Sequence, residues 1–312
     1  MLEAAPTWGT GHRSRDVLRL HLAVAGFGFA GVFGKLIGLP PVTIVAGRAG
    51  FAALAIAIIF MVRSRSLDLL PRSGRDFFSL SLGLLLAVHW FTFFQAVQVA
   101  TVGIALVSFS MAPILLLGME AVWRRRWPGP RPALASLVAM LGVLAVTPVL
   151  HWSNASVKGV VWGIASGGTY ALLVLLNRPM VVARLSPWRI AMWQNAVAAL
   201  ALAPFVALQS GPPTPGEWGL LALLGIVFTA GTHGLFLQSI RSVPAHVAVL
   251  TSTLEPGYGI LAAICILGEW PALRTLLGAA IIAAAVAYTT YHERVVAPLN
   301  GGPAVPGSSA GG

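Results

Sequence analysis

Long apolar runs, separated by short segments that carry most of the charge, dominate the pattern of this chain. A helix that crosses a bilayer needs about 20 mainly apolar residues, and about ten runs of roughly that length follow one another. We therefore expect an all-α polytopic membrane protein with ten transmembrane helices. The predicted spans cover residues 18–38, 42–62, 77–97, 101–123, 132–150, 158–177, 187–209, 217–238, 245–267 and 272–291.

The overall composition agrees with this pattern. The chain is 57% hydrophobic and 9% charged with a mean hydropathy of +0.84, which excludes an ordinary soluble domain. Its net charge of +11 suggests a nucleic-acid partner, but the basic residues lie in the short segments between spans and not along one polar face. We expect no nucleic-acid partner. Cys265 is the only cysteine, so it cannot form an intrachain disulfide, and we expect it in the core.

The basic residues also predict an orientation, because cytoplasmic segments of membrane proteins carry an excess of Lys and Arg. With the N-terminus inside, most of the 20 basic residues fall in cytoplasmic segments. An even number of spans then places both termini in the cytoplasm. We expect residues 1–17 to form a cytoplasmic tail and the Gly-, Pro- and Ser-rich residues 298–312 to form a disordered tail.

A duplication relates the two halves of the chain. Pro113 and Pro256 occupy equivalent places, and one constant offset aligns further residues along both segments. An odd number of spans per half reverses the direction of the second copy. We therefore expect two inverted five-helix repeats, residues 18–150 and 151–297. The other aligned pairs are Gln95 with Gln238, Ala105 with Ala248, Ser108 with Thr251, Ser110 with Thr253, and Arg126-Trp127-Pro128 with Glu269-Trp270-Pro271.

Prolines and small residues predict how these helices meet. A proline within a span removes a helical hydrogen bond, which is tolerated only against protein or a wet cavity. Pro113 and Pro256 therefore predict helix breaks near the bilayer centre that gate a pathway. Ridges of small residues at four-residue spacing let membrane helices approach closely. The two ridges are Gly26, Ala30, Gly34 and Gly38, and Gly159, Gly163, Gly167 and Ala171.

These features resemble the EamA-type branch of the drug/metabolite transporter (DMT) superfamily. The segments from Gln95 and Gln238, the two proline segments and the acidic corner Leu267-Gly268-Glu269 carry the resemblance over about residues 18–292. Within the superfamily the chain is most similar to the bacterial YddG-type aromatic amino-acid exporters. Arg126 replaces the glutamate that the family has at the first corner, so the two corners need not behave alike. The resemblance implies a multi-pass protein of the bacterial inner membrane that exports small metabolites.

Glu255 lies near the middle of the span 245–267, where a carboxylate is costly and requires a function or a partner. Thr251 and Ser252 stand about one turn before it and place hydroxyl groups on its face. Two interpretations remain open. In the structural one, Glu255 hydrogen-bonds groups freed by Pro256. In the functional one, its carboxylate attracts a substrate ammonium group or carries a proton.

Further polar and aromatic residues within the spans are candidates for a substrate pocket. Each half carries an imidazole near mid-membrane, which a role in holding helices together explains equally well. A stripe of aromatic and hydroxyl groups in the sixth span suits an amphipathic solute, although such stripes also serve packing. The predicted substrate-binding residues are His89, Trp90, Ser110, Trp162, Ser166, Thr169, Tyr170, His233, Ser252, Glu255 and Tyr258.

Other polar residues within the spans rank lower. We expect Arg48, near the outer end of the second span, to extend to the membrane surface. Trp193 suits a lipid-facing position, so Gln194 and Asn195 beside it also rank low. No histidine stands four residues from another and the cysteine is alone. We therefore predict no metal site and no cofactor.

The sequence thus predicts a transporter that exports small amphipathic metabolites, in particular amino acids including aromatic ones, by alternating access. Its partners are the lipid bilayer and the small-molecule substrate, and we expect a monomer. The alternative is a broad efflux pump for lipophilic cations, because a membrane carboxylate beside aromatic rings suits a cation as well. An intramembrane enzyme is less well supported, because the chain has no His-Glu-x-x-His motif and no pair of acidic residues within one span.

Overall fold

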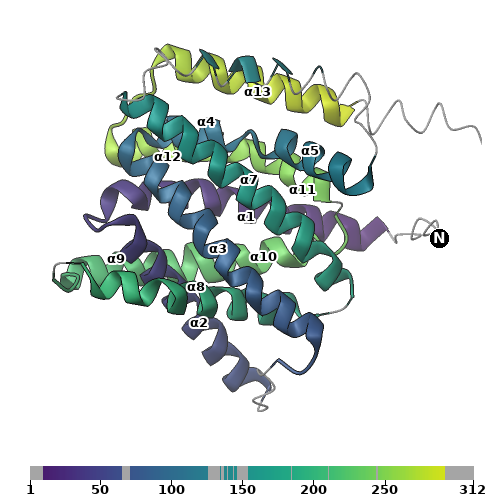
Figure 1. Ribbon diagram of the computed structural model, residues 1–312, viewed down its shortest axis with the longest axis vertical. Helices are drawn as coiled ribbons and strands as arrows, with labels where there is room; N and C mark the ends of the chain where they lie inside the picture. Colours follow the sequence, from purple (N-terminus) through teal and green to yellow (C-terminus); the bar gives the residue numbers. More distant parts are fainter. Residues whose placement is uncertain are drawn as a thin grey trace, which may run out of the picture.

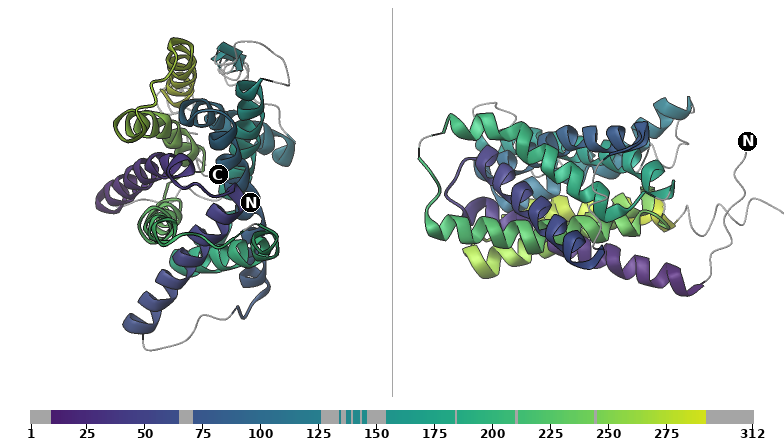
Figure 2. Two further views of the ribbon diagram at one scale, coloured as in Figure 1. Left: turned by 90° about the vertical axis from the view of Figure 1, so that its left-hand side faces the viewer. Right: turned by 90° about the horizontal axis from the view of Figure 1, so that it is seen from below.

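The computed structural model describes residues 10–64, 71–125, 134, 137–138, 140–142, 144–145, 154–183, 185–209, 211–243 and 245–291. Every regular element in these ranges is helical, and the helices lie side by side, with α13 and α2 at opposite ends of the long axis (Figure 1). The left view of Figure 2 looks along many of the helix axes. The helices are α1 (Thr10–Leu36), α2 (Pro41–Ser64), α3 (Gly74–Val99), α4 (Val102–Phe109), α5 (Ala112–Arg124), α7 (Ala155–Val182), α8 (Pro187–Ala207), α9 (Pro215–Gly225), η1 (Ile226–Gly231), α10 (Thr232–Ser239), α11 (Ala245–Thr251), η2 (Ser252–Leu254), α12 (Glu255–Ala262), η3 (Ala263–Leu267) and α13 (Leu273–Tyr291).

The predicted class, an all-helical membrane protein, is confirmed. Within the described ranges, eight helical segments are long and apolar enough to cross a bilayer, and each coincides with a predicted span. A ninth, shorter apolar helix covers Leu273–Ala285 within the last predicted span. The predicted span 132–150 lies largely outside the described residues, so the total of ten stays a prediction.

The two aligned prolines lie where membrane-spanning helices are interrupted. Pro113 stands in the first turn of α5, after a break at Ser110 and Met111, and Pro256 stands in the first turn of α12, after the 3₁₀ turn η2. A proline fits the first turn because its missing N–H has no helical acceptor there. The number of residues between the start of α4 and the start of α11 equals the number between Pro113 and Pro256. The starts of α5 and α12 are separated by the same number of residues. The duplication therefore extends to the position of the helix breaks.

The two halves interlock through equivalent helices. In the first half α1 packs against α10 and α12 of the second half, and in the second half α7 packs against α3 and α4 of the first. The second helices of the halves, α2 and α8, pack against each other. The first helix of each half thus packs mainly against helices of the other half. Much of the core therefore lies between the halves.

The small-residue ridges allow this close packing, as predicted. A Cβ atom at Gly163 would lie 2.6 Å from Ser108 Cβ, and one at Gly167 would lie 2.7 Å from the carbonyl oxygen of Phe109. In the first ridge, a Cβ at Gly34 would lie 2.9 Å from the ring of Phe94. Real Cβ atoms do not approach so closely. The backbones of α7 and α4 therefore touch where the sequence has glycine.

The acidic corner of the second half stabilises a helix of the first. Glu269 Oε1 accepts a hydrogen bond from the backbone N–H of Val102 at 2.8 Å, at the first residue of α4. The side chain of Thr101 satisfies a second free N–H of that helix, donated by Ile104. A carboxylate is favourable at a helix N-terminus because the free N–H groups there carry partial positive charge. The equivalent corner residue of the first half, Arg126, lies outside the described residues.

The expectation that Cys265 lies in the core is wrong. Its side chain is exposed, on the same outer surface as Leu261 and Ile266. In a membrane protein, lipid-facing and buried positions are both apolar, so hydrophobicity alone does not separate them.

We predict that Gly167→Ala lowers the thermal stability of the purified protein, whereas Gly168→Ala does not. Both changes raise helix propensity by about 1 kcal/mol, so they differ only in surroundings. A Cβ at residue 168 would lie 3.5 Å from its nearest neighbour, an ordinary contact, whereas one at residue 167 forces α7 and α4 apart. Thermal unfolding in detergent measures both. Equal melting temperatures for the two variants would contradict the close approach.

Candidate functional site

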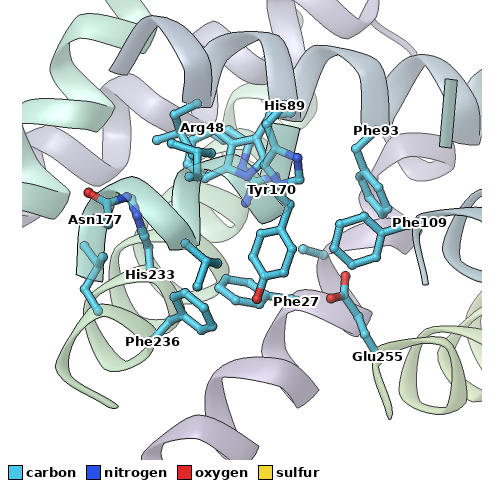
Figure 3. Close-up of a pocket in the computed structure, with 16 residues that line it drawn as sticks. Phe27, Arg48, His89, Phe93, Phe109, Tyr170, Asn177, His233, Phe236 and Glu255 are labelled. Atoms are coloured by element: carbon cyan, nitrogen blue, oxygen red, sulfur yellow. The ribbon is translucent and has the colours of Figure 1, made fainter. Parts of the chain in front are cut away.

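A central cavity lies beside the helix breaks and is lined by residues of both halves (Figure 3). The open space at its centre is about 60 Å³, which is room for about two water molecules. Pockets that hold metabolites usually measure roughly 300–1,000 Å³, so the open space in this conformation is too small for a metabolite. The lining residues are Phe27, Ala30, Arg48, Leu86, His89, Trp90, Phe93, Phe109, Tyr170, Leu173, Val174, Asn177, His233, Phe236, Leu237 and Glu255.

Glu255 points into this cavity as the first residue of α12 (Figure 3). Its side chain is only 5% exposed. It makes no hydrogen bond or ion pair with any residue that the structure describes. Its carboxylate is thus a buried acceptor turned toward the open space, available to a solute or to water.

Arg48 is the main correction to the sequence analysis, because it does not extend to the membrane surface. Its side chain is 2% exposed and lines the same cavity. Its Nε donates to Thr229 Oγ1 at 2.9 Å, and its guanidinium carbon lies 4.2 Å from the centroid of the Trp90 ring. Thr229 lies in the π-helical turn η1 and donates its own hydroxyl to the carbonyl of Leu224. The arginine is therefore held in the interior by a hydroxyl and an aromatic face.

Both predicted histidines line the cavity and also connect helices. His89 Nδ1 lies 3.0 Å from the carbonyl oxygen and 3.1 Å from the hydroxyl of Ser166, which joins α3 to α7. His233 Nδ1 accepts from Asn195 Nδ2 at 3.1 Å, which joins α10 to α8. Each ring thus has a structural partner at one nitrogen while it borders the open space.

Tyr170 connects the cavity wall to the break before Glu255. Its hydroxyl lies 2.7 Å from Ser252 Oγ in the 3₁₀ turn η2. Its ring contacts His89, Phe109 and Phe236. Aromatic side chains thus form much of the wall, and one of them fixes the turn that presents Glu255.

The structure brings together part of the predicted set. Five predicted residues line the cavity, namely His89, Trp90, Tyr170, His233 and Glu255. Ser166 and Ser252 support them through the hydrogen bonds described above. The remaining four lie outside the lining: Ser110 and Thr169 bond backbone carbonyls of their own helical segments, Trp162 packs against Phe91, and Tyr258 packs at the edge of the core.

Sequence reasoning missed three polar residues of this region. Arg48 and Asn177 line the cavity, and Asn195 holds His233. Trp193 is buried rather than lipid-facing, at 4% exposure, and Gln194 beside it bonds Asn177 at 2.6 Å. The position within the helix could have indicated these inward-facing residues. Arg48 stands seven residues after Pro41, which begins α2, and Gln194 stands seven residues after Pro187, which begins α8. Equivalent places in the two halves thus carry polar side chains directed inward.

An interlocked pair of helical halves, broken helices and a cavity between them that combines aromatic and ionisable side chains define a multi-pass membrane protein of the transporter class. The chain belongs to the EamA-like transporter family, whose model matches residues 17–147 and again residues 157–291.

Individual similarities agree with the family. The chain is 22% identical over 298 residues to "Uncharacterized transporter YxxF" of Bacillus subtilis (strain 168), covering 94% of this chain and 95% of that protein. It is 26% identical over 266 residues to an "Uncharacterized transporter" of Archaeoglobus fulgidus, covering 85% and 92%. A protein known from a crystal structure superposes with a TM-score of 0.67 at 18% identity, covering 91% of this chain and 99% of that one. The last similarity shows a shared fold.

We predict that Tyr170→Phe lowers the free energy of unfolding by about 1 kcal/mol, since it removes one buried hydrogen bond. Ser252 Oγ keeps its bond to the carbonyl of Ala248, so the hydroxyl is not left without a partner. Tyr258→Phe is the matched control, because Tyr258 forms no hydrogen bond with the described residues. Thermal or denaturant unfolding of both variants checks this. A larger loss in the control would refute the role of the Tyr170 hydroxyl.

Proposed function

We propose that this transporter exports small amphipathic metabolites, in particular amino acids including aromatic ones, across the bacterial inner membrane. Both termini lie in the cytoplasm in this proposal. The protein works by alternating access, in which its two halves change their packing around the central cavity. The breaks at Pro113 and Pro256 supply the points at which the helices bend.

The observation that carries the proposal is an aromatic cavity wall interrupted by ionisable side chains. Phe27, Phe93, Phe109 and Phe236 offer apolar surface, and Glu255 offers a buried acceptor among them. An amphipathic solute needs this combination, because its apolar part favours the rings and its ammonium group favours the carboxylate. The resemblance of the chain to amino-acid exporters favours the same class of solute.

The alternative, efflux of lipophilic cations, is less well supported by the charges of the cavity. Glu255 and the aromatic rings suit a cation. However, Arg48 lines the same cavity, and a fixed positive charge in a space of low dielectric repels a second one. A solute without net charge fits this pair of side chains better.

Export assays with a panel of labelled amino acids test the proposal directly. Cells or inverted vesicles that contain the protein are expected to transport aromatic or other large apolar amino acids faster than matched vesicles without it. A lipophilic cation such as tetraphenylphosphonium is measured in parallel. Transport of the cation alone would favour the efflux pump and overturn the amino-acid proposal.

We predict that Glu255→Gln reduces transport at least about tenfold without lowering the melting temperature. Glutamine keeps the shape and hydrogen-bonding capacity of the side chain but removes the charge that attracts an ammonium group. Transport rates and thermal unfolding, measured on the same preparation, separate the two interpretations of this residue. Intact transport with reduced stability would mean that the carboxylate serves the broken helix.

A further inference from the structure

The central cavity contains one basic and one acidic side chain that do not contact each other. Among its described lining residues, Arg48 is the strongly basic one and Glu255 the acidic one, and both side chains are at least nine-tenths buried. No ion pair joins either of them to a described residue. Figure 3 shows them on different sides of the cavity, with the Tyr170 ring between them in this view.

The surroundings of Arg48 leave one part of its guanidinium free. Nε is bonded to Thr229, and the Trp90 ring covers one face of the group. The two terminal nitrogens donate to no residue that the structure describes. These two nitrogens lie in one plane and form the fork that binds both oxygens of a carboxylate. Thr229 and Trp90 therefore hold the arginine in place without occupying the atoms that recognise a carboxylate.

The presence of a basic and an acidic side chain in one cavity favours a ligand that carries both a positive and a negative charge. An amine bound at Glu255 leaves Arg48 buried without a counter-charge, and a carboxylate bound at Arg48 leaves Glu255 in the same state. An uncompensated buried charge is strongly unfavourable. A zwitterion satisfies both side chains at once and adds no net charge to the interior.

We infer that Arg48 binds the carboxylate of the substrate while Glu255 binds its ammonium group, so that the cavity selects amino-acid zwitterions. This inference rests on the proposed function of amino-acid export. It adds Arg48 as the specificity-determining residue and excludes simple amines and simple acids as good substrates. The cavity must widen to admit the ligand, because about 60 Å³ holds only water.

Three compounds with the same ring test this selection in the wild-type protein. Phenylalanine carries both charges, phenethylamine lacks the carboxylate, and 3-phenylpropanoate lacks the ammonium group. Transport of labelled phenylalanine into inverted vesicles is measured with each unlabelled compound as competitor. Phenylalanine is expected to compete at least about tenfold better than either analogue, because a site built around a polar group rejects the analogue without it. Equal competition by all three would overturn the inference.

Arg48→Gln then tests the role of the arginine. The variant is expected to lower the preference for phenylalanine over phenethylamine at least about tenfold, while phenethylamine transport persists or rises. Arg48→Lys keeps the charge but not the fork, and an intermediate preference is expected. The matched control is Arg241→Gln, which removes the same charge from an exposed position and should leave the preference unchanged.

The outcomes separate this inference from the proposed function. Wild-type transport of phenylalanine, with equal loss of phenylalanine and phenethylamine transport in Arg48→Gln, would overturn the role of Arg48 and leave amino-acid export standing. A wild-type protein that moves no amino acid at all would refute the proposed function, and the inference with it. If Arg48→Gln does not fold, the competition between the three compounds in the wild type still decides the selection of zwitterions.

Discussion

Every backbone polar group that lies within a bilayer must find a partner inside the protein, and this constraint determines where the two spanning helices can be broken. At the first break, short turn bonds take over from the helical ones: the N–H of Ser110 reaches the carbonyl of Val107 as well as that of Leu106, and the N–H of Met111 reaches the carbonyl of Ser108. At the second break, the 3₁₀ turn η2 does the same. The rings of Phe109 and Tyr170 contact each other and are buried beside the breaks. The cavity lies here, where Ser110 and Ser252 of the interrupted backbone are enclosed by protein.

The same enclosure makes it possible to keep an arginine in the interior. A charged side chain at the centre of a bilayer costs about 3 kcal/mol even on insertion scales. Here the guanidinium is compensated in part by a hydroxyl and by the face of an indole ring. The hydroxyl belongs to the π-helical turn η1, and such wide turns occur frequently at functional sites. The stability of Arg48 in this place thus depends on α9, η1 and α10 of the second half, although Arg48 itself belongs to the first.

The sequence predicted features that depend on covalent or steric rules, and it did not predict features that depend on which way an apolar helix faces. Pro113 and Pro256 restrict the backbone directly, and the glycines of both ridges leave room for a neighbouring helix, so the breaks and the close packing of α7 could be predicted from the pattern. Burial could not, because lipid and protein interior are equally apolar solvents. Trp193 and Cys265 were placed on the wrong side of their helices for this reason, whereas Arg48 was placed at the membrane surface although it lies in the interior.

The two halves share a backbone plan but not the chemistry of their equivalent positions. Glu255 begins α12, whereas the first residue of α5, at the matching place, is Ala112. Arg48 of α2 corresponds by its place in the helix to Gln194 of α8, a neutral residue bonded to Asn177. In the proposed alternating-access mechanism, similar backbones allow the halves to exchange conformations, which requires the two packings to be close in energy. Because the side chains at equivalent positions differ, the proposed binding groups stay on particular helices during such an exchange. A ligand held between Arg48 of one half and Glu255 of the other would therefore report directly on the relative movement of the halves.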